Sequence, residues 1–267
     1  MRCPNCHANL RNESQLCPNC GTYVRYEGLS AETAAGSALA LGKKARLARL
    51  EADYTGAEFL SARAYNAVII GVLLYGIIVN VILCFAVGDV YRYINPALFL
   101  VLYFVCAIAG TIITARSSNP WVSFLGYNLV VVPLGLTIST LVEAYGGIGS
   151  GIVTTAFLYT GLITFGMLGA SMAFPELFEK IGGALLACLI GLVLCELVLL
   201  LFRVPQYVTD WFAAGLFSLY IGYDIYRSQQ FAKTLDNAVD CALDIYLDVA
   251  NLFIRILSIL ARSKSDD

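Results

Sequence analysis

Long stretches without a charged residue recur along most of this chain, and each is about long enough to cross a lipid bilayer. The first of them lies between Arg63 and Asp89. A helix needs ~20 mainly apolar residues to span the hydrocarbon core. Segments that meet or approach this length cover residues 65–87, 93–115, 121–141, 152–174, 181–202, 205–226 and 239–260. We therefore predict seven transmembrane helices.

The composition supports an all-α multi-pass membrane protein. Apolar residues make up 59% and charged residues 13% of the 267 residues, against ~45–50% and ~25% in a typical soluble domain. A chain of this size cannot bury so much apolar surface in water. The net charge of −2 gives no reason to expect a nucleic acid partner. Since no nucleophile–base set, phosphate-binding loop or cofactor motif is present, we do not expect an enzyme.

Four cysteines near the N-terminus have the spacing of a zinc site. Cys3 and Cys6 enclose one Pro-Asn pair, and Cys17 and Cys20 enclose another. Two such turns supply the four thiolates of a tetrahedral zinc site, and in so short a segment the metal would supply the folding energy. We predict a zinc ribbon over residues 1–26, with His7 as a bystander. The alternative is two disulfides, which would require an oxidising compartment.

A linker is predicted over residues 27–62, between the ribbon and a transmembrane domain over residues 63–262. Ser30 is a candidate helix N-cap, and the basic stretch 43–50 follows it. The amphipathic helix that this pattern allows could lie on the membrane surface or be solvated. Neither arrangement implies catalysis.

The distribution of Lys and Arg predicts a cytosolic N-terminus in the plasma membrane. Cytosolic loops carry an excess of these residues. With that orientation the cytosolic side carries Lys43, Lys44, Arg46, Arg49, Arg63, Arg116, Lys180, Arg227 and Lys233. The outer loops hold Arg92 and Arg203, and they also hold Arg262 and Lys264 if the last segment spans rather than re-enters. A reducing cytosol favours zinc over disulfides at the ribbon.

The last segment differs from the others because polar residues follow a helical period along it. They are separated by steps of 4, 4, 3, 4, 3 and 4: Asp240, Asp244, Asp248, Asn251, Arg255, Ser258 and Arg262. This period places them on one face, the polar stripe. A charge facing lipid at mid-depth costs at least ~2.5–3.5 kcal/mol, so we expect the stripe to face the bundle interior. The alternative is a surface helix with the stripe in water.

Two motifs near the C-terminus strongly resemble the Bax inhibitor-1 (TMBIM) family. They are residues 217–224 (FSLYIGYD) and 243–257 (LDIYLDVANLFIRIL). Residues 133–139 and 165–170 show a weaker similarity to the same family. The resemblance covers about residues 60–262 and leaves the ribbon outside. It implies a seven-helix bundle with a central segment wrapped by the others. It also implies a pH-sensitive calcium leak governed by two aspartates, which by motif position are Asp224 and Asp248.

The chemistry of two neighbouring acids fits this implied role. Two carboxyl groups in a site of low dielectric cannot both ionise cheaply, so one keeps a proton to an unusually high pH. The shared proton would close the path, and its loss would leave two anions that attract Ca²⁺. Asn251 and backbone carbonyls would add oxygen ligands, and Asp244 lies one turn away on the same stripe. The alternative is a structural acid pair without conduction.

The positions of the two aspartates also predict a recessed site. Asp248 lies on the order of 13 Å along its helix from the start of the segment, whereas Asp224 lies near the end of the preceding one. The two acids can therefore meet only if the end of the sixth segment is sunk into the bundle.

Two further residues relate less simply to the family pattern. In bacterial relatives an acid and an arginine on the second segment help to hold the closed state. Arg116 matches that arginine, but residues 96–115 contain no acid, so the complete latch is not expected here. Glu196 is an acid that the resemblance does not explain, and we expect it to pair with a cation or a hydroxyl group. The alternative for Glu196 is a proton-accessible site. Three other acids near segment ends are expected to be solvated: Asp89, Glu143 and Asp210.

The sequence thus predicts a cation leak in the lipid bilayer, gated by the Asp224–Asp248 pair, with zinc as a structural cofactor of the ribbon. A rival interpretation is a non-conducting regulator that binds other membrane proteins. In that case the ribbon would serve as the docking site for a protein partner.

Overall fold

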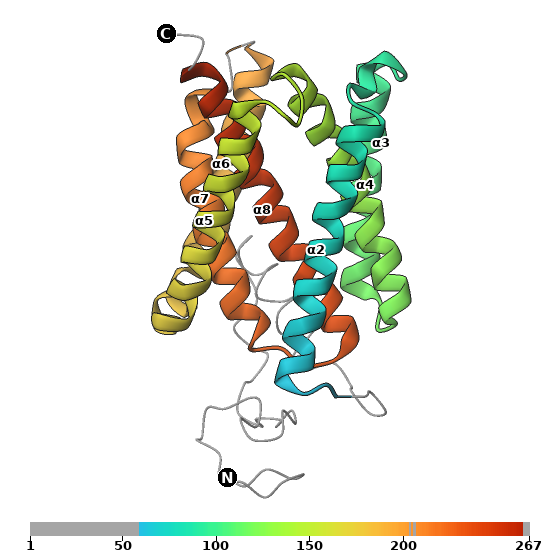
Figure 1. Cartoon of the computed structure of the whole chain (residues 1–267). Helices are drawn as coiled ribbons and strands as arrows, with labels where there is room; N and C mark the ends of the chain where they lie inside the picture. The colour runs from blue at the N-terminus through green and yellow to red at the C-terminus, as the bar shows by residue number, and fades with distance from the viewer. Residues whose placement is uncertain (1–58, 203, 205–206, 264–267) are drawn as a thin grey trace, which may run out of the picture.

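The computed structural model describes residues 59–202, 204 and 207–263. The predicted zinc ribbon and nearly all of the predicted linker lie outside these residues. Seven α-helices run side by side along one axis (Figure 1), and each predicted segment coincides with one of them. The helices are α2 (Ala62–Ala86), α3 (Pro96–Arg116), α4 (Pro120–Ala144), α5 (Gly151–Ala173), α6 (Pro175–Leu201), α7 (Tyr207–Ser228) and α8 (Leu235–Ser263), with a 3-10 turn, η2 (Val90–Arg92), between α2 and α3.

Short polar side chains and prolines set where several helices begin. Ser61 and Ser150 accept hydrogen bonds from the first-turn N–H groups of α2 and α5. Asn95 and Asn119 do the same for α3 and α4, and in each case proline occupies the first helical position. Such caps satisfy N–H groups that have no partner within the helix, and proline loses nothing there. These helix starts can therefore be read from the sequence.

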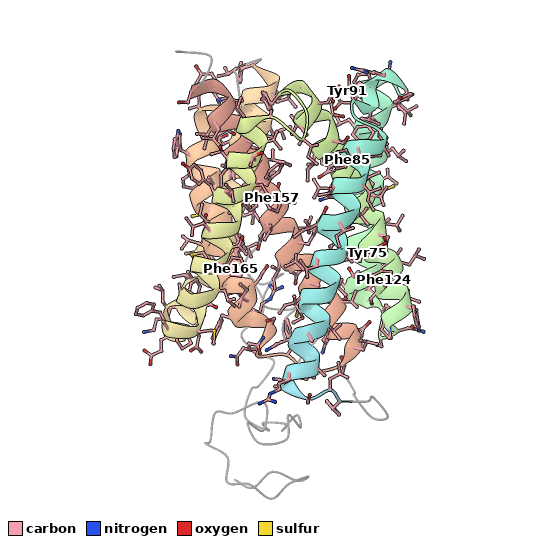
Figure 2. All side chains as sticks on the ribbon, viewed as in Figure 1. Tyr75, Phe85, Tyr91, Phe124, Phe157 and Phe165 are labelled. Atoms are coloured by element: carbon pink, nitrogen blue, oxygen red, sulfur yellow. The ribbon has the colours of Figure 1, made fainter. Side chains whose placement is uncertain are left out.

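Five of the helices, α2 to α6, are long and apolar enough to cross a membrane. Their outer faces carry large apolar side chains, among them Phe85, Phe157 and Phe165 (Figure 2). Phe85 is 72% exposed and Phe165 74% exposed. So much exposed apolar surface is not tolerated on a monomeric soluble protein. The chain is a multi-pass membrane protein.

Helix α8 lies in the middle of the bundle and runs from one end to the other (Figure 1). It packs against α2, α4, α5 and α7. It begins beside the start of α2 and ends at the opposite end of the bundle (Figure 1), so it does not turn back on itself. A helix with this many charged residues can occupy the centre because its neighbours supply partners for the charges.

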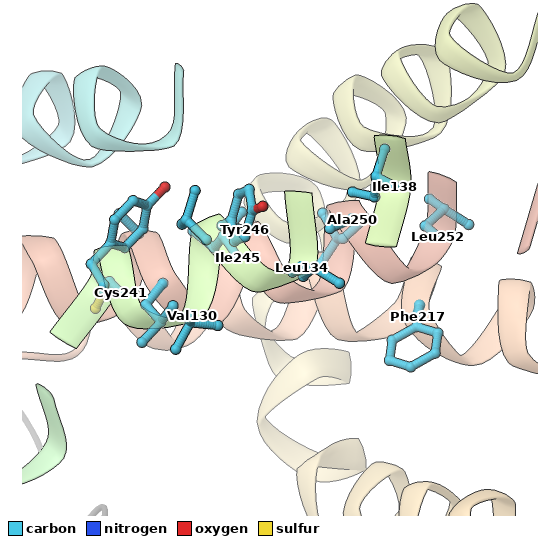
Figure 3. Close-up of a cluster of buried hydrophobic side chains, with 14 of the residues drawn as sticks. Val130, Leu134, Ile138, Phe217, Cys241, Ile245, Tyr246, Ala250 and Leu252 are labelled. Atoms are coloured by element: carbon cyan, nitrogen blue, oxygen red, sulfur yellow. The ribbon is translucent and has the colours of Figure 1, made fainter. Parts of the chain in front are cut away.

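The apolar core forms where α4 and α7 pack against α8. Leu134 and Ile138 of α4, Phe217 of α7 and Leu252 of α8 contribute to it (Figure 3). Nearby, the Tyr246 hydroxyl and the Asn80 side chain of α2 lie 2.8 Å apart and are hydrogen-bonded. The core therefore fixes α8 laterally, and the polar residues of the stripe occupy the remaining face.

Helices α3 and α4 cross at two glycines. A Cβ atom added to Gly110 would lie 2.6 Å from the carbonyl oxygen of Gly126, and one added to Gly126 would lie 2.8 Å from the carbonyl oxygen of Gly110. Backbone atoms cannot move aside as a flexible side chain can. The close approach of α3 to α4 therefore depends on glycine at both positions.

Candidate functional site

Asp224 of α7 and Asp248 of α8 meet in the bundle interior. Their carboxyl groups are close enough to interact electrostatically, and each residue is 7% exposed. A carboxylate can only accept, so a direct hydrogen bond between two neighbouring acids would require a proton on one of them. Within the described residues, Oδ2 of Asp248 is buried and has no hydrogen-bond partner. The structure therefore brings together, in a buried site, the two aspartates that the sequence motifs single out.

Arg227 brings a positive charge to this pair. Its Nη1 atom lies 3.6 Å from Oδ1 of Asp224, and its Nη2 atom donates to Oδ2 of Asp244. The rings of Tyr223 and Phe231 lie 5.7 Å from the guanidinium carbon. The sequence alone indicates a role for Arg227 only as one of the basic residues on the predicted cytosolic side. The available signal was its position three residues after Asp224, a spacing at which opposite charges on a helix meet.

The site thus contains three carboxyl groups and one guanidinium group. With one proton shared by Asp224 and Asp248 its net charge is −1, and without that proton it is −2. Asp244 belongs to the site through its ion pair with Arg227. Among the residues that the structure describes, no group of three or more His, Cys, Asp or Glu is arranged to hold a metal ion. The arrangement offers a cation negative charge rather than a closed set of ligands.

The connection between α7 and α8 is sunk into the bundle. Ser228 is 2% exposed and Phe231 2% exposed, although both lie at or beyond the end of α7. The segment before α2 covers this connection, because the Leu60 N–H donates to the carbonyl oxygen of Lys233 at 2.7 Å. The end of α7 is therefore shielded from solvent at Ser228 and Phe231.

Two other predicted site residues form no hydrogen bond or ion pair with the two acids in the part of the chain that the structure describes. Asn251 donates from its side chain to the carbonyl oxygen of Leu247, one turn earlier on its own helix. Arg116 lies exposed at the end of α3 and forms no ion pair with any described residue. Arg116 therefore does not form the latch that the family pattern implies. The positively charged side chain beside Asp224 is that of Arg227.

Glu196 belongs to a second charged cluster, nearer the C-terminal end of α8. Nη2 of Arg255 lies 2.6 Å from Oε1 of Glu196, and Nη1 of Arg255 lies 3.0 Å from Oδ1 of Asp210. Oδ2 of Asp210 lies 2.8 Å from Nη2 of Arg262. The Thr209 hydroxyl donates to Glu196 at 3.1 Å. We call Glu196, Asp210, Arg255 and Arg262 the outer cluster; it joins α6, α7 and α8.

The expectation that Asp210 is solvated is wrong. Asp210 lies in the first turn of α7 but is 3% exposed, because the last turns of α8 pack beside it. Both arginines of the outer cluster lie on the polar stripe, so their side chains reach the same carboxylate. A buried carboxylate needs such partners to offset the loss of water.

Known proteins resemble this chain over its whole helical region. A family model described as inhibitor of apoptosis-promoting Bax1 matches residues 57–266. An uncharacterised protein of Helicobacter pylori is 36% identical over 102 residues, which is 37% of this chain and 43% of that protein. An uncharacterised protein of Campylobacter jejuni is 34% identical over 128 residues, 47% of this chain and 53% of that protein. The chain thus spans about half the length of these relatives.

Proposed function

This chain belongs to the Bax inhibitor-1 family, and from that premise we propose that it is a pH-sensitive leak pathway for Ca²⁺ or a similar cation. Protonation of the Asp224–Asp248 pair would gate the pathway. The observation that supports the proposal is the pair of neighbouring acids, buried between two helices of a membrane-spanning bundle. We propose no catalytic reaction for this protein.

In this proposal the proton is the gate. While one proton bridges the two carboxyl groups, it ties α7 to α8 and removes one negative charge. When the proton leaves, two anions repel each other across a short distance, and α7 and α8 separate at this point. The same two anions attract a hard cation that prefers oxygen ligands. Cation flux should therefore rise as pH rises.

We further propose that the end of the bundle where α8 begins faces the cytosol of the plasma membrane. The described basic residues at that end include Arg63, Arg116, Lys180 and Lys233, whereas Arg92 and Arg262 lie at the other end. An excess of Lys and Arg is typical of cytosolic loops. The recessed aspartate pair would then be reached from the cytosolic side.

The rival function is a non-conducting regulator that binds other membrane proteins. Reconstitution of the purified full chain in liposomes with an enclosed Ca²⁺ indicator separates the two. We expect Ca²⁺ entry above that of protein-free liposomes, and faster entry at pH 8 than at pH 6. Entry no faster than in protein-free liposomes at both pH values would support the regulator instead.

The N-terminal ribbon should bind one zinc ion per chain through Cys3, Cys6, Cys17 and Cys20, because their paired spacing matches a tetrahedral thiolate site. Metal analysis of the purified chain measures the stoichiometry, and removal of residues 1–26 should abolish the zinc while leaving the bundle folded. Disulfides between these cysteines, detected by mass spectrometry, would contradict the zinc site.

A further inference from the structure

The outer cluster lies on the same stripe of α8 as the aspartate pair. Arg255 follows Asp248 by seven residues, which is ~10 Å along the helix. Both residues belong to the face that points into the bundle, and α8 continues past Arg255 to the opposite end of the bundle (Figure 1). Along the stripe toward that end, the Arg255 guanidinium is therefore the next charged group that a cation leaving the pair would meet.

The charges of the outer cluster balance. Glu196 and Asp210 contribute two negative charges, and Arg255 and Arg262 contribute two positive charges. Arg255 is the residue that links the acids of two helices, because its two terminal nitrogens reach Glu196 of α6 and Asp210 of α7. Its side chain is 15% exposed, so water screens its charge only in part.

We infer that the outer cluster is a second barrier on the cation path, and that the Arg255 charge sets its height. This inference rests on the proposed function and adds to it an outer control of cation flux. Loss of the Arg255 charge gives the cluster a net charge of −1, which attracts a cation. Loss of the Glu196 charge gives it a net charge of +1, which repels a cation.

The two substitutions distinguish a charge barrier from a mechanical tether. In liposomes at a fixed high pH, Arg255→Gln should raise Ca²⁺ entry and Glu196→Gln should lower it, each by at least about threefold. The double variant should return toward the wild-type rate. If the ion pair only holds α6 against α8, both single variants loosen it and both raise the entry rate, and that result overturns the inference.

Folding is controlled in two ways. Glu196→Gln keeps an acceptor for the Thr209 hydroxyl, so its fold is the less disturbed of the two. Arg255→Lys keeps the positive charge with different geometry, so its Ca²⁺ entry should stay well below that of Arg255→Gln. An equal rise in Arg255→Lys and Arg255→Gln would assign the effect to lost packing and would overturn the inference.

A measurement that does not depend on ion flux tests this inference separately from the proposed function. Ser258 lies one turn beyond Arg255 on the stripe and is partly exposed. In a Ser258→Cys chain, a cationic and an anionic methanethiosulfonate reagent should modify residue 258 at rates whose ratio reports the local charge. Mass spectrometry assigns the modification, since the chain has nine other cysteines.

The ratio of cationic to anionic modification should rise with Arg255→Gln and fall with Glu196→Gln. If liposomes that contain the wild-type chain show no Ca²⁺ entry, the modification ratio can still change as expected in the two variants. In that case the proposed function fails and the charge assignment of the outer cluster stands. If Ca²⁺ enters but neither entry nor ratio follows the two substitutions, the barrier is refuted and the proposed function stands.

Discussion

Replacing Asp210 with alanine is expected to destabilise the bundle by about 1–3 kcal/mol, because Arg262 loses its carboxylate partner and Arg255 keeps only Glu196. Arg255 and Arg262 lie 3.0 and 2.8 Å from its two carboxylate oxygens. Asp210 is also the residue through which α7 is joined electrostatically to the end of α8. Unfolding of the purified variant in detergent, compared with the wild-type chain, measures the change.

The matched control is Glu143→Ala at the exposed end of α4. Glu143 pairs with Arg92 at 3.6 Å, but their side chains are 42% and 66% exposed. An exposed ion pair contributes at most about 1 kcal/mol, so this variant should unfold nearly as the wild type does. Similar losses of stability in the two variants would show that the buried cluster does not stabilise the fold in this way.

Replacing Arg227 with glutamine should move the pH dependence of cation flux upward by about 1–3 pH units. The guanidinium contacts Asp224 and Asp244, and its positive charge favours their ionised forms. Without that charge the aspartate pair holds its proton more firmly, so the path opens only at higher pH. The pH profile of Ca²⁺ entry into liposomes measures the shift.

Arg227→Lys is the control, because it keeps a positive charge and loses only the planar, two-point geometry. Its pH profile should lie between those of the wild type and Arg227→Gln. A profile that stays in place in Arg227→Gln would mean that Arg227 does not act on the protonation of the pair, and its role would then be limited to holding Asp244.

The helices could be predicted from the sequence because few backbone conformations are stable inside a bilayer. Backbone groups in hydrocarbon must be satisfied within the segment, so each uncharged stretch of sufficient length becomes a helix. The polar stripe of α8 could be predicted equally well, because its helical period holds over six steps. The prediction that the stripe faces the interior followed from the cost of placing Asp248 against lipid, and Asp248 is indeed buried.

The partners of the charged residues could not be predicted in the same way. A helical period gives the face on which a residue lies but not which helix lies opposite. Asp210 looked like a residue at a segment end, and only the packing of α7 beside the last turns of α8 shows that Arg255 and Arg262 enclose it. Arg227 was counted for its charge alone, because its contact with Asp244 depends on the buried connection between the two helices.

The family motifs, rather than the physics of the stripe, selected Asp224 and Asp248 among the acids of the last two helices. Asp240 is buried on the same helix, so burial alone would not have distinguished it from Asp248. What the structure adds is that Asp248 faces the acid of α7.

The most direct test of the proposed gate is the pH profile of Ca²⁺ entry into liposomes that contain the wild-type chain, Asp224→Asn or Asp248→Asn, with Glu179→Gln as a control for loss of one exposed charge. The wild-type chain and the control should show entry that rises with pH. In both asparagine variants the entry should be lower and nearly independent of pH, because no proton can be shared and one negative charge is gone. Wild-type pH dependence in both asparagine variants would contradict gating by the pair.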